Sequence, residues 1–302
     1  MRRRQRARRR RERVARPPDR RCGGPGPPVR PPVAALRLRL GATIVAGLLV
    51  VAAAAAWIAP YDPTTQVLAE NLAPPTAAHL LGQDKLGRDI LARIVYGTRV
   101  SLAVGVVTVL VSLGIGAAIG ALAGFAGGWV DEIVMRAIDV LLAFPGLLLA
   151  IALTGILGPS LRNVVIALCL IGWTGYARLA RSEVVRLRER EFVEAARALG
   201  VPERRILVRH VAPLLATPML VQATFGMAAA IVAEASLSFL GLGAQPPTPS
   251  WGAMLNDGRA FVLVAPHLTV FPGLAIFVTV LGLTFLGDGL RDRLDVRRPT
   301  EL

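Results

Sequence analysis

The sequence predicts an all-α, polytopic membrane protein with six transmembrane helices. The composition is 54% hydrophobic and the mean hydropathy is +0.54, which is too apolar for a soluble domain of ordinary composition. Long runs without a charged residue recur along the chain, and arginine concentrates in alternate segments between those runs. The apolar runs predict the number of spans, and the arginines predict their orientation.

Six segments are long and apolar enough to cross a bilayer, which takes about 20 helical residues. They are 40–59, a stretch within 100–130, 133–157, 161–179, 213–239 and 267–287. Arg162 and Arg178 shorten the uncharged part of the fourth segment, but long arginine side chains can reach back to the membrane surface. Pro145 removes a backbone donor inside the third segment, so we expect a kink there.

The basic character of the chain is concentrated at its N-terminus. Residues 1–40 hold fifteen arginines against Glu12 and Asp19, whereas the rest of the chain carries twenty Lys and Arg against eighteen Asp and Glu. A tail rich in Arg and Pro has little apolar surface to bury, so residues 1–35 are expected to be disordered. We favour an arm retained in the cytoplasm over a tail that binds anionic lipid or nucleic acid, and nucleic acid is not expected as a partner.

Both termini are predicted to lie in the cytoplasm, because lysine and arginine accumulate in short segments on that side of a membrane. Segment 178–212 holds nine arginines, and the segment after residue 287 holds four. An even number of spans places both on the side of the N-terminal tail. Segment 240–266, on the opposite side, has only Arg259. A short cytoplasmic C-terminal tail is expected at 293–302.

Glycines in the second span predict close packing between helices. Gly116, Gly120, Gly124 and Gly128 recur every four residues, so a helix aligns them on one face. A face without side chains lets another backbone approach closely. Glycine-rich apolar helices also produce this spacing by chance, and we favour genuine packing.

The charged segment 191–215 interrupts the apolar runs, yet it has the pattern of a helix. One apolar stripe is predicted from the spacing i, i+3, i+4 and i+7 of Phe192, Ala195, Ala196 and Leu199. Gly200 is expected to end this helix, because glycine adopts the left-handed conformation at little cost.

A second helix is predicted after the turn at Gly200. Pro202 suits its first turn, and its own stripe consists of Ile206, Leu207, Val211 and Leu214. A helix lying on the lipid surface and a solvated loop are the alternatives. The small side chains of Ala195 and Ala196 permit close approach by another protein, and they favour a docking element on the cytoplasmic face.

The motif EAARALG at 194–200, followed thirteen residues later by Pro213, resembles the EAA loop of the inner-membrane subunits of bacterial ABC importers. Further blocks are similar to the second permease subunit of the dipeptide/oligopeptide/nickel importer family. They are LGRDILARIVYGTRVSLAVG (86–105), GGWVDEIVMRAIDVLLAFPGLLLAIAL (127–153), GWTGYARLARSEVVRLREREFVEAARALG (172–200), AEASLSFLGLGAQPPTPSWGAML (233–255) and TFLGDGLRD (284–292). The resemblance covers roughly residues 35–297. The family's usual LGTD is LGQD here, with Gln83 in place of the threonine.

The resemblance implies the type I fold of ABC importer permeases, with a transmembrane core at 98–292 after a first helix and external segment at 36–97. It also implies a place in the bacterial inner membrane, a related permease as heterodimer partner, two cytoplasmic ATPase subunits and an external substrate-binding protein, without a cofactor. Coupling to the ATPases falls to a loop at about 186–213. Its implied core is Glu194, Ala195, Ala196 and Gly200, with Phe192, Leu199 and Ile206 as apolar contacts.

Peptides are the default substrate that the resemblance implies, with nickel, glutathione-like peptides and oligosaccharides open. The chain is not expected to be an enzyme. A phosphate-binding loop of the GxxxxGK[ST] type needs a lysine, and the only lysine is Lys85, in GQDKLG. A stand-alone secondary carrier is the alternative from another class. It predicts charges near mid-span, whereas the clear internal acids here lie near span ends.

Two acidic residues are candidates for gate or structural charges. Asp139, near the start of the third span, is at the right spacing to pair with Arg136, and we favour that role over a substrate contact. Glu234, near the outer end of the fifth span, is expected to hold the outer gate or the partner subunit. The three histidines are far apart in the sequence and lack metal-ligand spacing, so no metal site is expected.

Overall fold

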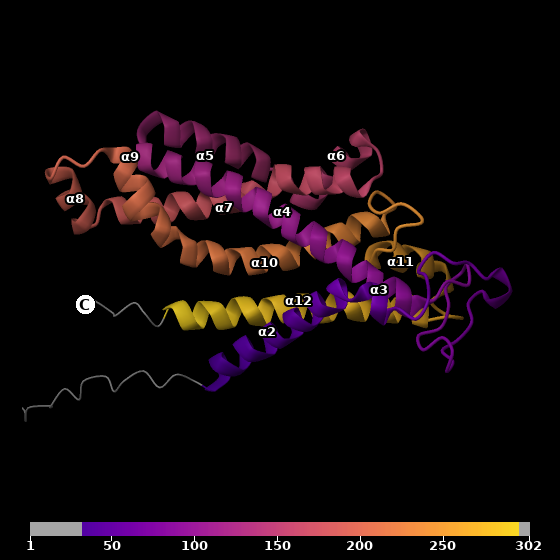
Figure 1. The fold of residues 1–302 in the computed structure, drawn as a ribbon. Coiled ribbons are helices and arrows are strands. Elements are labelled where there is room, and N and C mark those ends of the chain that lie inside the picture. The colour runs from indigo at the N-terminus through magenta and orange to yellow at the C-terminus, as the bar shows by residue number, and fades with distance from the viewer. Residues whose placement is uncertain (1–31, 296–302) are drawn as a thin grey trace, which may run out of the picture. The chain divides into compact units, whose positions relative to one another are not determined.

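The computed structural model describes residues 32–295, which form helices joined by loops (Figure 1). The longer helices are α2 (Pro32–Ala53), α4 (Ile90–Ala126), α5 (Gly128–Leu142), α6 (Gly146–Leu157), α7 (Leu161–Arg188), α10 (Ala212–Phe239) and α12 (His267–Asp295). The short elements are α3 (Ala55–Ile58), η1 (Leu68–Glu70), α8 (Glu191–Ala198), α9 (Glu203–Ile206), η2 (Leu207–Val211), α11 (Trp251–Gly258) and η3 (Arg259–Phe261). The predictions for residues 1–31 and 296–302 lie outside the described range.

Within that range, five helices are long and apolar enough to span a membrane: α2, α4, α7, the helix that runs through α9 and α10, and α12. The pair α5 and α6 is the sixth candidate, bent by 81° at its break. Pro145 is the cause, because its extended backbone (ψ 121°) ends the helical path and caps α6. The kink expected in the third span is therefore a complete break.

The packing of α4 on α7 shows the direction in which the broken pair runs. A Cβ added at three glycines of α4 would lie 2.4, 2.1 and 2.8 Å from carbonyl oxygens of α7, in the pairs Gly116 with Trp173, Gly120 with Ala177 and Gly124 with Arg181. Residue numbers rise together along both helices, so α4 and α7 are parallel. The chain between them, α5 and α6, therefore returns to the end from which α4 started.

The glycine prediction holds for three of its four positions. Gly116, Gly120 and Gly124 make the close backbone contacts that their spacing indicates. Gly128 does not belong to this face, because α4 ends at Ala126 and a Cβ at Gly128 meets no atom within 4 Å. A second close contact joins α2 to α12, where Gly41 lies against the backbone of Leu286.

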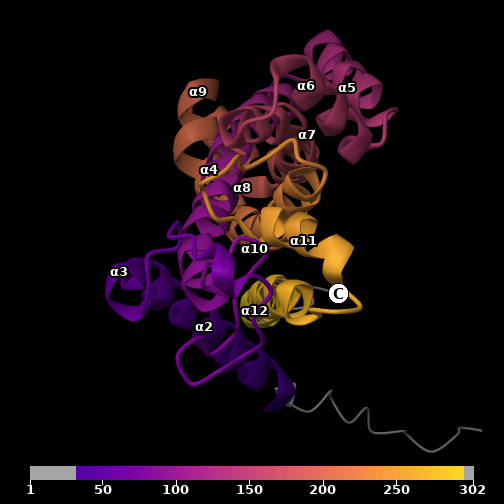
Figure 2. The same ribbon diagram turned by 90° about the vertical axis from the view of Figure 1, so that its right-hand side faces the viewer.

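The connecting elements gather at the two ends of the helices (Figure 1). α8 and α9 lie at one end, toward which α12 also runs, whereas α3 and α11 lie at the other. Figure 2 looks onto the end that carries α3 and α11. The described chain therefore begins and ends on the side of α8, as an even number of passes requires.

Candidate coupling site

The charged segment folds as the predicted helix, turn and helix. α8 ends at Ala198 with Leu199 as its C-cap, and Gly200 has a φ of +74°, in the left-handed region. The amide of Gly200 donates to the carbonyl of Arg197 (2.9 Å), and the amide of Val201 donates to the carbonyl of Ala196 (3.1 Å). This pair of hydrogen bonds is the Schellman motif. The sharp turn therefore depends on a backbone conformation that residues with a Cβ resist.

An ion pair spans the turn. Nε of Arg197 lies 2.9 Å from Oε1 of Glu203, in the first turn of α9, and this hydrogen bond raises the pKa of Arg197 above its ordinary value. The same guanidinium lies 5.9 Å from the ring centre of Phe125, near the end of α4. Pro202 is the N-cap of α9, one position before the predicted first turn. An exposed ion pair thus bridges the two arms of the turn, and the Arg197 side chain also lies near α4.

The inner face of α8 packs into the helix bundle. Val193 and Ala196 are buried in one hydrophobic cluster with Ile206 and Val211. The expectation that Ile206 contacts a partner needs correction, since its side chain is fully buried. Ala196 lies in the segment 186–213 as expected, but on this inner face. The i, i+3 spacing of Val193 and Ala196, which sequence reasoning did not use, turns that face toward the core.

The outer face of α8 consists of Phe192, Ala195 and Leu199. All three are exposed, Phe192 to 41% and Leu199 to 84%, and the charged residue Glu194 lies beside them in the sequence and is also exposed. These three residues therefore form an apolar surface beside the exposed charges of Glu191, Glu194 and Arg197. Such a surface is typical of a protein-binding element.

The elbow, residues 186–213, is joined to two spans without a flexible linker. Only Glu189 and Arg190 separate α7 from α8. On the other side, α9, the π-helical turn η2 and α10 form one continuous helix from Glu203 to Phe239. Pro213 lies in the first turn of α10, where a missing amide is tolerated, and it is not the start of the helix. α8 is therefore connected to α7 and α10 by short segments.

Comparison with known proteins identifies the family. A family model described as "Binding-protein-dependent transport system inner membrane component" matches residues 116–298, and one described as "N-terminal TM domain of oligopeptide transport permease C" matches residues 39–75. The chain belongs to the inner-membrane permeases of binding-protein-dependent ABC importers. The permease is 47% identical over 264 residues to the glutathione transport system permease protein GsiD of Pectobacterium atrosepticum, covering 85% of this chain and 88% of the relative. It is 49% identical over 249 residues to GsiD of Escherichia coli, covering 82% of each chain.

The first charge candidate of the permease, Asp139, pairs with a different arginine from the one expected. Its carboxylate accepts a hydrogen bond from Arg178 of α7, whereas Arg136 pairs with an acid of its own helix, Glu132. A second pair joins the same two helices, since Arg181 of α7 donates to Asp131 of α5 (2.9 Å). Asp139 thus joins two helices, because the chain reverses at Gly127 and α5 packs against α7. Sequence spacing alone cannot show a pair between helices.

Glu234, the second candidate, is fully buried near the end of α10. It accepts a hydrogen bond from Oγ of Ser238 (2.7 Å), and the same Oγ accepts one from the amide of Ala244 (3.1 Å). The other carboxylate oxygen has no hydrogen-bond partner among the described residues. Glu234 therefore holds the loop that follows α10, and its role in a gate stays a prediction.

Sequence reasoning missed a buried charge network at the end that carries α11. Arg88 donates to Asp84 (2.7 Å) and to Asp257 of α11 (3.2 Å), and Arg93 lies 3.5 Å from Asp84. Lys85 adds an ion pair to Asp257 at 2.7 Å. The clustering of charges at 84–93 was the only available signal. This clustering could not show that Asp257, far along the chain, completes the network. The network fixes α11 to the start of α4.

Proposed function

We propose that the permease forms half of the translocation path of a peptide importer in the bacterial plasma membrane. Its partners are a related permease, two cytoplasmic ATPase subunits and an external binding protein, and the elbow and both termini lie in the cytoplasm. Family membership supports this assembly, and the arginine-rich segments support the orientation. Peptides are supported by the two GsiD relatives, which are named for glutathione, a small peptide.

The observation that carries the coupling role is the outer face of α8, on an elbow joined directly to two spans. Closure of an ATPase pair against Phe192, Ala195 and Leu199 pushes on a short rigid helix. Because α7 and α10 continue from the elbow, the push tilts both spans together. This is a rigid-body change between two states, in which ATP binding selects one state of the path.

Substitution of Leu199 by Asp tests the docking surface. Leu199 is 84% exposed, so we expect the variant to fold and insert normally. A buried apolar contact at an interface is worth about 1–2 kcal/mol or more, so affinity for the ATPase subunits should fall about 5- to 30-fold or more, with a matching loss of uptake. Leu263→Asp is the matched control, because Leu263 is 98% exposed in the segment before α12, away from the elbow. Undiminished ATPase binding by Leu199→Asp would exclude this face as the docking surface.

The substrate needs a separate measurement. Proteoliposomes that hold the complete transporter should take up glutathione and trialanine in an ATP-dependent manner. Uptake of nickel with neither peptide imported would overturn peptide transport and leave the coupling role intact.

A further inference from the structure

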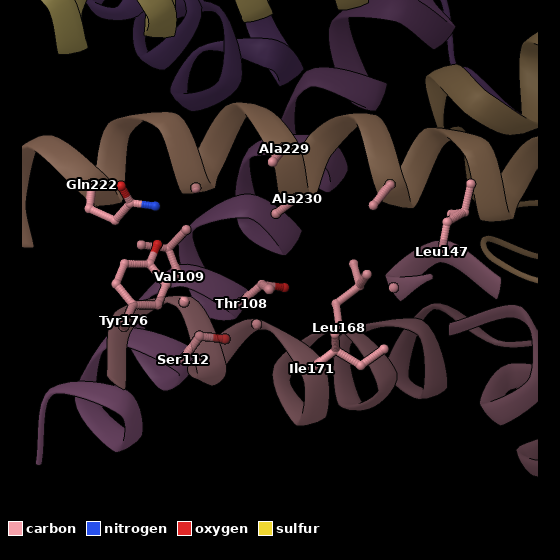
Figure 3. A pocket seen from close by; sticks show the side chains of 15 residues that line it. Thr108, Val109, Ser112, Leu147, Leu168, Ile171, Tyr176, Gln222, Ala229 and Ala230 are labelled. Carbon is pink, nitrogen blue, oxygen red and sulfur yellow. The ribbon is translucent and has the colours of Figure 1, made fainter. Parts of the chain in front are cut away.

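A hollow of about 220 Å³ lies at the end of the bundle that carries α11. Its wall is formed by residues within 66–93, 238–248 and 253–257, and charged side chains take part in it. It differs in this respect from the groove between α4, α6, α7 and α10, whose wall is mainly small and apolar (Figure 3). The proposed orientation places this outer hollow on the external side of the membrane, at the opposite end from the elbow.

The ion pairs beside the outer hollow leave a surplus of positive charge. Lys85, Arg88 and Arg93 are the cations, and all three line the hollow. Within the described residues they form ion pairs with two acids, Asp84 and Asp257. Because two carboxylates cannot neutralise three cations, this group of side chains carries one unbalanced positive charge.

Arg93 is the cation with the most distant partners. Its side chain is 3% exposed, its nearest carboxylate oxygen, on Asp84, is 3.5 Å away, and that of Asp257 is 3.9 Å away. Its hydrogen bond to the carbonyl of Pro63 is also long, at 3.5 Å. Arg88, in contrast, donates to Asp84 at 2.7 Å. Water screens a buried charge only weakly, so the surplus acts on the hollow beside it.

The groups that can touch a ligand in the outer hollow are hydrogen-bond donors. The Lys85 side chain is 39% exposed, and its ammonium has three donors, of which one faces Oδ1 of Asp257 at 2.7 Å. Thr248 is exposed and Asn256 is partly exposed, and neither side chain has a hydrogen bond within residues 32–295. Both oxygens of Asp257 are already occupied, since Oδ2 accepts from Arg88 at 3.2 Å. The hollow therefore offers an ammonium, an amide and a hydroxyl to an acceptor.

A carboxylate fits this combination of charge and donors. One negative charge balances the surplus, whereas a dianion such as phosphate would exceed it and a cation would add to it. The two oxygens of a carboxylate can accept from an ammonium and from a neutral donor at the same time. Every free peptide carries such a group at its C-terminus.

We propose that the outer hollow is a subsite for the C-terminal carboxylate of the peptide substrate. Lys85 is the cation in contact with the carboxylate, and the buried charges of Arg88 and Arg93 lie behind it. The proposal rests on the proposed peptide import and specifies which part of the substrate the permease recognises on the external side.

Direct binding tests the subsite. The complete transporter in nanodiscs, without binding protein, is titrated with trialanine and with trialanine amide, in which a neutral amide replaces the C-terminal carboxylate. We expect the wild type to bind trialanine about two- to fivefold more tightly than the amide, the range that a partly exposed ion pair provides. Lys85→Gln should remove most of this difference, and Lys85→Arg should keep most of it. Arg259→Gln is the control, because Arg259 is exposed near α11 without lining the hollow, and it should bind both ligands like the wild type.

Asp257→Asn provides a second test with the opposite sign. It removes one negative charge beside the hollow, so the variant should bind trialanine more tightly than the wild type does, with folding checked by thermal unfolding. A network with a purely structural role predicts unchanged or weaker binding instead. If this variant does not fold, the Lys85 variants decide the question.

Equal affinities of the wild type for trialanine and its amide, or an unchanged difference in Lys85→Gln, overturn the subsite. Reduced affinity of Lys85→Gln for the binding protein, with unchanged peptide binding, also overturns it and assigns the hollow to an acidic side chain of that protein. The peptide function fails by a separate measurement, namely if the wild-type transporter with its binding protein imports neither trialanine nor glutathione.

Discussion

Replacing Gly200 with Val perturbs the elbow through its backbone alone. Gly200 has a φ of +74°, and a Cβ there meets no atom within 4 Å, so added volume causes no clash. An L-residue in the left-handed region costs roughly 1–2 kcal/mol, and a β-branched residue lies at the upper end of that range. About 2 kcal/mol corresponds to roughly a 30-fold change in the population of the intact turn. We therefore expect ATPase-subunit affinity and peptide uptake to fall by up to about 30-fold.

Gly200→Asn distinguishes an effect on the backbone conformation of the turn from the loss of a contact between residue 200 and a partner. Asparagine adopts the left-handed region more readily than other residues with a Cβ, so this variant should keep most of the affinity. The assay is titration of the purified permease, together with its proposed partner, with ATPase subunits in nanodiscs, with folding checked by thermal unfolding. Equal losses in Val and Asn variants would refute the conformational argument, because they would show that a partner needs the bare surface of Gly200.

Two further predictions concern positions away from the elbow. Gly120→Ala places a methyl group 2.1 Å from the Ala177 carbonyl oxygen and should lower the free energy of unfolding in detergent by about 1–3 kcal/mol. Gly114→Ala is the control, because its methyl group meets open space, and it should be neutral or slightly stabilising. Equal effects of the two substitutions would contradict the α4–α7 packing. Glu234→Gln keeps the hydrogen bond to Ser238 and should unfold like the wild type. Glu234→Leu removes this bond and should lower the free energy of unfolding by about 1–3 kcal/mol. A Leu variant as stable as the wild type would show that the bond does not hold the loop after α10.

Much of the coupling site was predictable because its signals are local. The left-handed turn at Gly200 follows from glycine's freedom at a helix end, and the structure confirms it. The stripe on α8 was predicted less well. Phe192 and Leu199 face outward while Ala196 faces inward, because the hydrophobic cluster beneath α8 takes the face that carries Val193. Which side of a short amphipathic helix is buried depends on the surface it meets.

The charge candidate Asp139 also shows that packing, and not sequence spacing, decides which residues meet. Asp139 and Arg136 have suitable spacing, but Arg178 is the actual partner because α5 turns back after α4 at Gly127 and packs against α7. Pro145 predicted a change of direction, whereas the size of the bend depends on what the two halves pack against. The surplus charge of the outer hollow gave no sequence signal, since the number of acids and bases that meet there depends on the fold.

The sequence by itself determined the membrane class, the succession of apolar spans, the glycine face of α4 and the turn of the elbow. Each of these follows from composition, from helical period or from the conformational freedom of one residue. Only the tertiary structure decided the partner of Asp139, the outward face of α8, the network around Asp257 and the outer hollow beside Lys85. These depend on side chains from helices far apart in the chain, and their meeting is set by packing, which a linear pattern does not record.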